Sequence, residues 1–113
     1  MSLDLPRADD ISLIRSMCHF LNDQPTHRAT IQGLTSWTLS TVRELTGASW
    51  KRSRVYHYRS ALLALGFASK LSVYELELTD VGRELVQCKD RLEQIDEPLN
   101  DREQEIFCRV LPS

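Results

Sequence analysis

The chain has 113 residues, of which 42% are hydrophobic and 27% are charged, and its formal net charge is −2. This length and composition predict one soluble globular domain and exclude the fibrous and low-complexity classes. No apolar run approaches the roughly 20 residues of a membrane-spanning helix. The polar N-terminus lacks the apolar core of a signal peptide, and the odd number of widely spaced cysteines argues against a secreted disulfide framework, so we expect a cytoplasmic protein.

A first amphipathic helix is predicted to begin at Asp9 or Asp10, whose carboxylates can cap free N–H groups, and to end in the proline-containing segment 22–27. Its apolar positions recur at helical spacing and are Ile11, Leu13, Ile14, Met17, Cys18, Phe20 and Leu21. Residues 28–37 carry only a weak pattern, which leaves two interpretations open: a short strand over Ala29–Ile31, or a partly helical linker.

A second, short helix is predicted from about Leu39 to Thr46, with Thr38 or Ser40 as its cap and Gly47 as its stop. The inner face of this helix is predicted to consist of Leu39, Val42 and Leu45.

A longer helix is predicted from about Trp50 to Leu65 and has two different halves. The first half is basic and rich in hydrogen-bonding side chains, whereas the second half is apolar and belongs in a core. The apolar positions at helical spacing are Val55, Tyr58, Leu62 and Leu65. Gly66 suits the left-handed conformation that commonly ends a helix.

A strand-like alternation follows this helix. Two short strands, Phe67–Leu71 and Val73–Leu78, are predicted to form a tight hairpin. The inner face of the second strand is predicted to consist of Tyr74, Leu76 and Leu78.

Two helices are predicted after the hairpin. The first is capped by Thr79 and runs from Asp80 to about Ile95. Its apolar residues alternate at spacings of four and three, as in a coiled-coil seam, and are Val81, Leu85, Cys88, Leu92 and Ile95. The second helix begins at a capping box of Asn100 and Glu103. The seam predicts a homodimer through residues 80–111, and packing on the first helix of the same chain is the alternative.

Charge is distributed unevenly along the chain. Residues 45–74 contain no acid and have a net charge of +5, whereas residues 1–44 have −1 and residues 75–113 have −6. The bases in the acid-free window are Lys51, Arg52, Arg54, Arg59 and Lys70. Such a basic stripe is typical of a nucleic-acid contact, and a solvated basic face balanced by the acidic last third is the alternative.

The stretch from about residue 38 to 87 contains three segments in succession: VRELTG, SWKRSRVYHYRSALLALGF and YELELTDVGRELV. In that order they resemble the first helix and turn, the recognition helix, and the returning wing strand with the next helix of a winged helix–turn–helix domain of prokaryotic transcription regulators. The resemblance implies a mainly α fold with a small β-hairpin wing over residues 1–95. Residues 96–113 would form a C-terminal helix that acts in dimerisation or begins a missing region.

A recognition helix over 50–65 would enter the major groove of double-stranded DNA with its exposed half. The residues expected to contact bases are Arg52, Ser53 and Tyr56, those expected to contact phosphates are Lys51, Arg54 and Arg59, and His57 is a further surface donor. Lys70 is expected at the tip of the wing, where it would reach the backbone or the minor groove. Trp50 and Tyr58 are expected in the core rather than as stacking platforms.

Catalysis, metals and cofactors are not expected, because the chain has no Gly-rich phosphate loop, no G-x-S-x-G elbow and no zinc-ligand spacing among its cysteines and histidines. The alternative function is a winged-helix protein-interaction module cut from a larger protein. It is suggested by the acidic last third and by an end at Pro112-Ser113 directly after an apolar helix.

Overall fold

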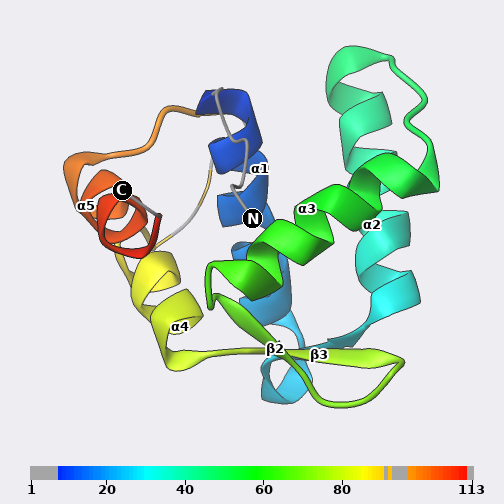
Figure 1. Cartoon of the computed structure of the whole chain (residues 1–113). Helices are drawn as coiled ribbons and strands as arrows, with labels where there is room; N and C mark the ends of the chain where they lie inside the picture. The colour runs from blue at the N-terminus through cyan, green and yellow to red at the C-terminus, as the bar shows by residue number, and fades with distance from the viewer. Residues whose placement is uncertain (1–7, 91, 93–96, 112–113) are drawn as a thin grey trace.

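The structure is mainly helical, with a small antiparallel sheet at one end (Figure 1). It is a computed structural model that describes residues 8–90, 92 and 97–111. Its helices are α1 (Ala8–Asp23), α2 (Ile31–Thr46), α3 (Arg52–Ala64), α4 (Asp80–Gln87) and α5 (Asp101–Val110), with a 3-10 turn at Pro25–His27; its strands are β1 (Arg28–Thr30), β2 (Ala68–Lys70) and β3 (Glu75–Leu78). The predicted mainly α class with a small β element is confirmed. None of the described helices is both long and apolar enough to cross a membrane.

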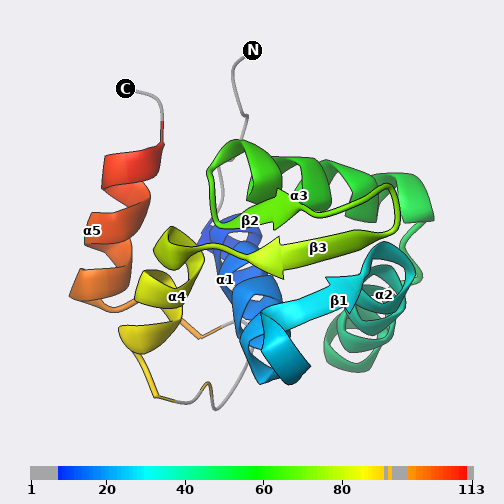
Figure 2. The same ribbon diagram turned by 90° about the horizontal axis from the view of Figure 1, so that it is seen from below.

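Helix α1 lies at the centre of the molecule, with α4 and α5 on one side and α2 on the other (Figures 1 and 2). The predicted apolar stripe forms the core side of α1: Ile14, Met17, Cys18 and Leu21 are completely buried. Ile11 and Phe20, at the ends of the stripe, are partly buried against the same core. The first helix was therefore readable from its own periodicity.

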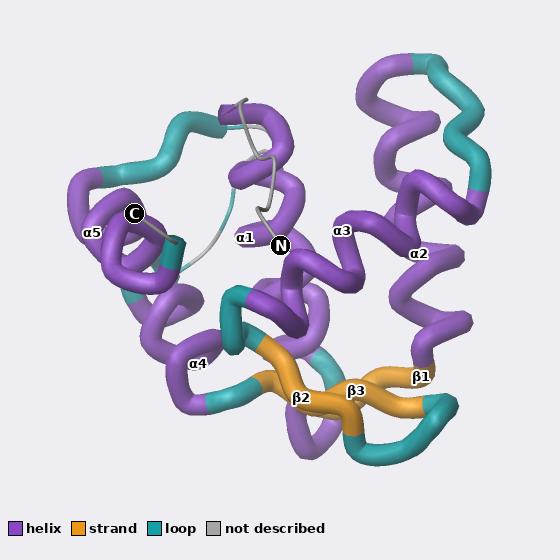
Figure 3. The backbone as a smooth tube through the Cα atoms, viewed as in Figure 1, coloured by secondary structure: helices purple, strands orange, loops and turns teal. Residues whose placement is uncertain are grey.

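The sheet has three strands in the order β1-β3-β2, rather than the two strands of an isolated hairpin (Figure 3). The weak segment 28–37 is part strand and part helix: β1 covers Arg28–Thr30, one residue earlier than the predicted strand, and the rest is the start of α2. β1 pairs with β3 through Ala29 opposite Leu76. Leu76 and Leu78 are buried as predicted. Tyr74 was also predicted on the inner face, but it is 75% exposed. The reason is that β3 begins at Glu75, so Tyr74 belongs to the loop 71–74.

Helix α2 begins at Ile31, so the predicted start near Leu39 is wrong. Its cap is Thr30, whose side-chain oxygen accepts a hydrogen bond from the Gly33 amide at 2.9 Å. The end of the helix is as predicted, since Gly47 adopts a left-handed φ of 73°.

The early part of α2 was missed because threonines occupy its core face. Thr35 and Thr38 are buried, and each hydroxyl donates to the carbonyl four residues earlier at 2.8 Å. A threonine that is satisfied in this way can replace an apolar residue on a buried helix face. Leu45 was predicted on the inner face of this helix, but it is 47% exposed, because the last turn of α2 extends past the core.

Helix α3 is slightly shorter than predicted, with its first half carrying the basic residues. Its inner residues Val55, Tyr58 and Leu62 are buried, and so is Leu65, the residue that caps it. Gly66 then takes the expected left-handed conformation, with a φ of 83°.

Helix α4 ends at Gln87, so the predicted helix over 80–95 is wrong. Leu92 lies outside any helix, and Ile95 lies outside the described residues. The chain turns after Gln87 because the segment that follows is held elsewhere: the Asn100 side chain donates to the Cys88 carbonyl at 3.1 Å, and Lys89 pairs with Glu97.

The predicted capping box at the start of α5 is confirmed, with Asn100 and Glu103 each accepting a hydrogen bond from the other's backbone amide. Ile106 and Phe107 are buried in the core of the same chain, where the Phe107 ring meets the Phe67 ring edge-on with a centroid distance of 5.2 Å. The apolar surface of α5 is thus largely covered without a second subunit.

Candidate nucleic-acid interface

The first half of α3 exposes the side chains that the sequence singles out. Val55 and Tyr58 turn toward the core, whereas Arg52, Ser53 and Tyr56 are exposed, and Arg59 is half-buried. The exposed fraction of Tyr56 is 54%, unusually large for an aromatic side chain on a structured helix. The alternation follows the helical period, so one face anchors α3 and the other is presented to solvent.

Among the residues that the structure describes, no carboxylate pairs with the basic residues of the acid-free window. The ion pairs among the described residues are Arg15–Glu103, Arg28–Glu77, Arg83–Asp80, Lys89–Glu97 and Arg109–Glu84. None of these pairs involves the window over 45–74. Its guanidinium and ammonium groups are therefore available to an external anion.

A surface groove of about 800 Å³ brings part of the predicted site together. Helix α3 lines it with Arg52, Ser53, Tyr56 and Arg59. The start of α2 and the loop between β2 and β3 form its other sides and contribute Thr30, Ile31, Gln32, Thr35, Val73 and Tyr74. No carboxylate is among these ten lining residues.

Two arginines of α3 stack on aromatic rings, on different sides of the helix. The Arg59 guanidinium lies 4.9 Å from the centre of the Tyr56 ring, and both residues line the groove. The Arg54 guanidinium lies 4.0 Å from the centre of the Trp50 ring, which itself stacks on Tyr58 at 5.4 Å. Tyr58 is buried and Trp50 half-buried, so the expectation that these two rings pack in the protein is confirmed.

The structure leaves the remaining predicted contacts outside the groove. Arg54 and His57 are exposed on other parts of α3, and Lys51 is exposed at its N-cap. Lys70 is exposed at the last position of β2, beside the loop 71–74 that forms the actual tip of the hairpin. The predicted residues thus divide into a groove set and a set that surrounds it.

Sequence reasoning missed the second and third sides of the groove. The start of α2 was hidden by its threonines, although Thr30 followed by apolar residues at 31 and 34 is a readable helix start. Tyr74 was placed on the inner face by extending the strand alternation too far. The loop and α2 are joined here by a hydrogen bond, in which the Ile31 amide donates to the Tyr74 carbonyl at 2.8 Å.

The electrostatics of the groove favour an anion. The N-terminal turns of both α2 and α3 contribute lining residues, and neither first turn contains an acidic residue. The dipole of each helix places partial positive charge at this end, which adds to the charges of Arg52 and Arg59.

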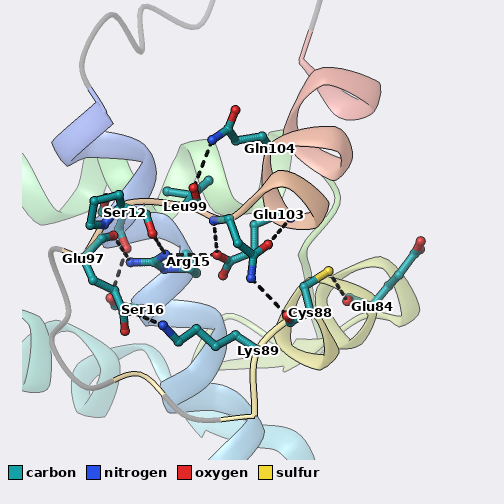
Figure 4. Close-up of polar contacts among 12 residues, drawn as sticks. Ser12, Arg15, Ser16, Glu84, Cys88, Lys89, Glu97, Leu99, Glu103 and Gln104 are labelled. Atoms are coloured by element: carbon teal, nitrogen blue, oxygen red, sulfur yellow. Dashed lines mark hydrogen bonds and ion pairs between the residues drawn. The ribbon is translucent and has the colours of Figure 1, made fainter.

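A second polar cluster lies between α1 and α5, and it is closed to solvent (Figure 4). Arg15 and Glu103 are completely buried and form an ion pair at 3.2 Å, and Arg15 also donates to the carbonyls of Glu97 and Pro98. Burial raises the pKa of the nearby Cys18 thiol far above its usual range. These groups are engaged in holding the fold. In the described part of the chain, no three His, Cys, Asp or Glu side chains are grouped to hold a metal ion.

Comparisons of the chain with protein-family models, with curated proteins and with solved structures gave no match.

Proposed function

We propose that this chain binds double-stranded DNA as a winged helix–turn–helix domain and regulates transcription, with α3 in the major groove. The observation that carries the proposal is the exposed first half of α3. There Lys51, Arg52 and Arg54 lie in an acid-free segment and, within the described residues, pair with no carboxylate. Long cationic donors of this kind bind phosphates and the edges of guanine.

The arrangement around α3 supports the proposal. Helices α2 and α3 are joined by the short connection 47–51, and the β2–β3 hairpin lies beside α3 (Figure 2). This order of helices and strands is compatible with a winged helix. A B-DNA major groove admits one α-helix, and the buried side of α3 leaves its opposite face accessible.

The proposed division of labour is the one expected from the sequence. Arg52, Ser53 and Tyr56 lie together on one face of α3 and are the proposed base contacts. Lys51 and Arg54, outside the groove, and Arg59, which lines it, are the proposed phosphate contacts, while Lys70 would approach the backbone from the hairpin. Stacking on Trp50 fixes the Arg54 guanidinium in place, which lowers the entropic cost of a phosphate contact.

The test is fluorescence anisotropy with a random duplex at several salt concentrations. The parent should bind, with an affinity that falls steeply as salt rises. Arg52→Ala should cost about 1–3 kcal/mol if it reads a base, whereas Arg54→Ala should weaken all sequences alike and lower the salt slope by about one.

Arg109→Ala is the matched control, because Arg109 is an exposed arginine that already pairs with Glu84 at 2.9 Å. It should leave DNA affinity nearly unchanged. A double variant, Arg52→Ala with Arg54→Ala, that binds as well as the parent would contradict the role of α3.

The alternative is a protein-interaction module, and one observation favours it. The hairpin loop exposes three large apolar side chains, Leu71, Val73 and Tyr74. Exposed apolar residues at one site commonly mark a protein contact. Absence of DNA binding even at low salt would support this function over the first.

The homodimer through residues 80–111 stays a prediction, and fewer observations support it than the sequence pattern suggested. The coiled-coil seam that suggested it requires a helix beyond Gln87, and Ile106 and Phe107 are already buried within one chain. Light scattering at micromolar concentration tests it: a mass twice that of one chain would support the dimer, and the mass of a single chain would contradict it.

A further inference from the structure

We infer that the groove between α3, the start of α2 and the loop 71–74 binds a nucleotide whose base is unpaired. The protein would then prefer DNA with a single-stranded end over the same duplex with a blunt end. This inference deepens the proposed function, since it concerns the same surface and rests on nucleic-acid binding there.

The charges of the groove select a ligand with negative charge. Arg52 and Arg59 both line it, and neither pairs with a carboxylate in the described part of the chain. The N-terminal turns of α2 and α3 add partial positive charge, and the ten lining residues include no acid to offset it. A phosphate group fits this environment, because arginine forks bind phosphate oxygens and the partial positive charge of a helix N-terminus favours an anion.

The aromatic side chains of the groove select a flat ring. Tyr56 lines it from α3 and Tyr74 lines it from the loop, with exposed fractions of 54% and 75%. Solvent-exposed tyrosines are stacking platforms for bases, and Arg59 already stacks on one of them at 4.9 Å. Val73, exposed beside Tyr74, extends the apolar surface.

A phosphate and an aromatic ring occur together in a nucleotide. In an intact duplex the faces of each base are covered by its neighbours, and only the edges are accessible in the grooves. Tyrosine rings in a groove can therefore stack only on a base that has left the duplex stack. The volume of about 800 Å³ is in the range of small-ligand sites, which suits a base with its phosphate and is too small for a duplex.

Polar groups that could meet the edge of the base are also present. The Gln32 amide and the Ser53 hydroxyl line the groove, from α2 and α3 respectively. The Ile31–Tyr74 backbone hydrogen bond connects the loop to the start of α2, so the aromatic side of the groove is anchored before the ligand binds.

The experiment compares two DNA hairpins with the same stem, one blunt and one with a short single-stranded overhang, by fluorescence anisotropy. The parent protein should bind the overhang hairpin about tenfold more tightly, as expected from stacking of one base. Tyr74→Ala should remove this advantage and should weaken binding of the blunt hairpin much less, because Tyr74 is not among the proposed duplex contacts. A fluorescent adenine analogue in the overhang should be quenched on binding by the parent but not by Tyr74→Ala.

Leu71→Ala is the matched control, because Leu71 is an exposed apolar residue of the same loop that does not line the groove. It should keep the overhang preference. Equal affinity for the two hairpins, or a preference that survives in Tyr74→Ala, would overturn the inference. A free nucleoside monophosphate that binds as tightly as the overhang hairpin would also overturn it, because the groove would then serve a small metabolite.

The outcomes separate this inference from the proposed function. Binding of the blunt hairpin with no overhang preference would leave duplex recognition intact and remove the nucleotide site. Binding of single-stranded DNA without binding of the blunt hairpin would do the reverse.

Discussion

Arg15 and Arg52 are the same residue type in opposite situations. Arg15, on α1, is completely buried, and its guanidinium meets Glu103 at 3.2 Å and the backbone carbonyls of Glu97 and Pro98 (Figure 4). Arg52, on α3, is exposed and pairs with no carboxylate of the described chain. The charge of Arg15 is neutralised within the fold, whereas the charge of Arg52 is available to a binding partner.

The contrast teaches where function can be sought in this molecule. A buried charge must be neutralised within the protein, because its desolvation is costly and no solvent replaces the lost interactions. An exposed charge that lacks a partner costs almost nothing, so the fold does not require the basic residues of α3 to pair within the protein. These exposed basic side chains form part of the candidate binding surface.

The strongest test of this comparison is the same substitution, arginine to methionine, made separately at Arg15 and at Arg52. Arg15→Met should lower the free energy of unfolding by about 3–5 kcal/mol, because Glu103 would be left buried without a counterion. Arg52→Met should change it by less than about 0.5 kcal/mol, as is usual for exposed positions. Urea denaturation measures both, and equal losses for the two variants would remove the distinction.

A double-mutant cycle shows whether the loss comes from the pair. Arg15→Met combined with Glu103→Leu should recover much of the stability, since no charge then remains buried. Recovery should be incomplete, because Glu103 also accepts a hydrogen bond from the Asn100 amide at 2.9 Å. Losses that simply add would show that the two side chains act independently.

The second largest effect is expected at the inner face of α3. Leu62 is completely buried in the core, so Leu62→Ala should cost about 2–5 kcal/mol. DNA affinity measured where the variant is still folded should be unchanged, because Leu62 is buried in the core and Arg52 is exposed. A thermal midpoint equal to that of the parent would contradict the inward orientation.

Substitution of Gly82 should cause a smaller loss of stability, and whether stability falls or rises tests how closely α4 packs. A Cβ there would lie 2.2 Å from the Phe67 carbonyl oxygen and 2.5 Å from Leu78 Cδ1. Alanine is favoured over glycine in a helix by about 1 kcal/mol, yet a clash with backbone cannot be relieved by a rotamer change. Gly82→Ala should therefore lower stability by about 1–3 kcal/mol.

Gln87→Ala, at the exposed end of the same helix, is the control for Gly82→Ala and should be nearly neutral. Calorimetric midpoints of the two variants give the comparison directly. A stabilised Gly82→Ala would mean that helix propensity dominates and that α4 packs less closely on Phe67.

Local signals made a large part of the fold predictable. The stripe of α1, the two faces of α3 and the capping box of Asn100 and Glu103 each depend on residues within one element, so sequence periodicity and capping chemistry identify them. The start of α2 and the end of α4 were not predicted in this way. Buried threonine hydroxyls disguised the first, and contacts of Asn100 and Glu97 with distant residues determined the second.

The candidate site was predictable to the same extent. Its α3 side follows from the basic, acid-free pattern of one helix. The sides formed by Gln32 and Tyr74 depend on the pairing of β1 with β3, which brings the start of α2 next to a loop more than 40 residues away in sequence. No local rule shows that pairing, and Arg15 illustrates the same limit, because its partner Glu103 lies on another helix.

The smallest predicted effect is a dependence of the free energy of unfolding on pH, and it comes from His19, whose pKa is influenced by its burial and by the buried Arg15. Burial, and after it the charge of Arg15, lower the pKa of His19 below its ordinary value. The unfolded chain therefore binds a proton more readily than the folded one. The stability contribution of neutral His19 should be complete above about pH 6.5 and should be lost progressively as the pH falls below that value toward the folded-state pKa.

Urea denaturation of the parent at several pH values between neutral and mildly acidic measures this loss. His19→Gln should flatten the profile, since glutamine does not titrate. His57→Gln, on the exposed face of α3, is the matched control and should keep the profile of the parent. If His57→Gln flattened the profile and His19→Gln did not, the pH-sensitive group would lie on the candidate binding surface. The distinction between the buried cluster of Arg15 and the exposed basic face of α3 would then be wrong.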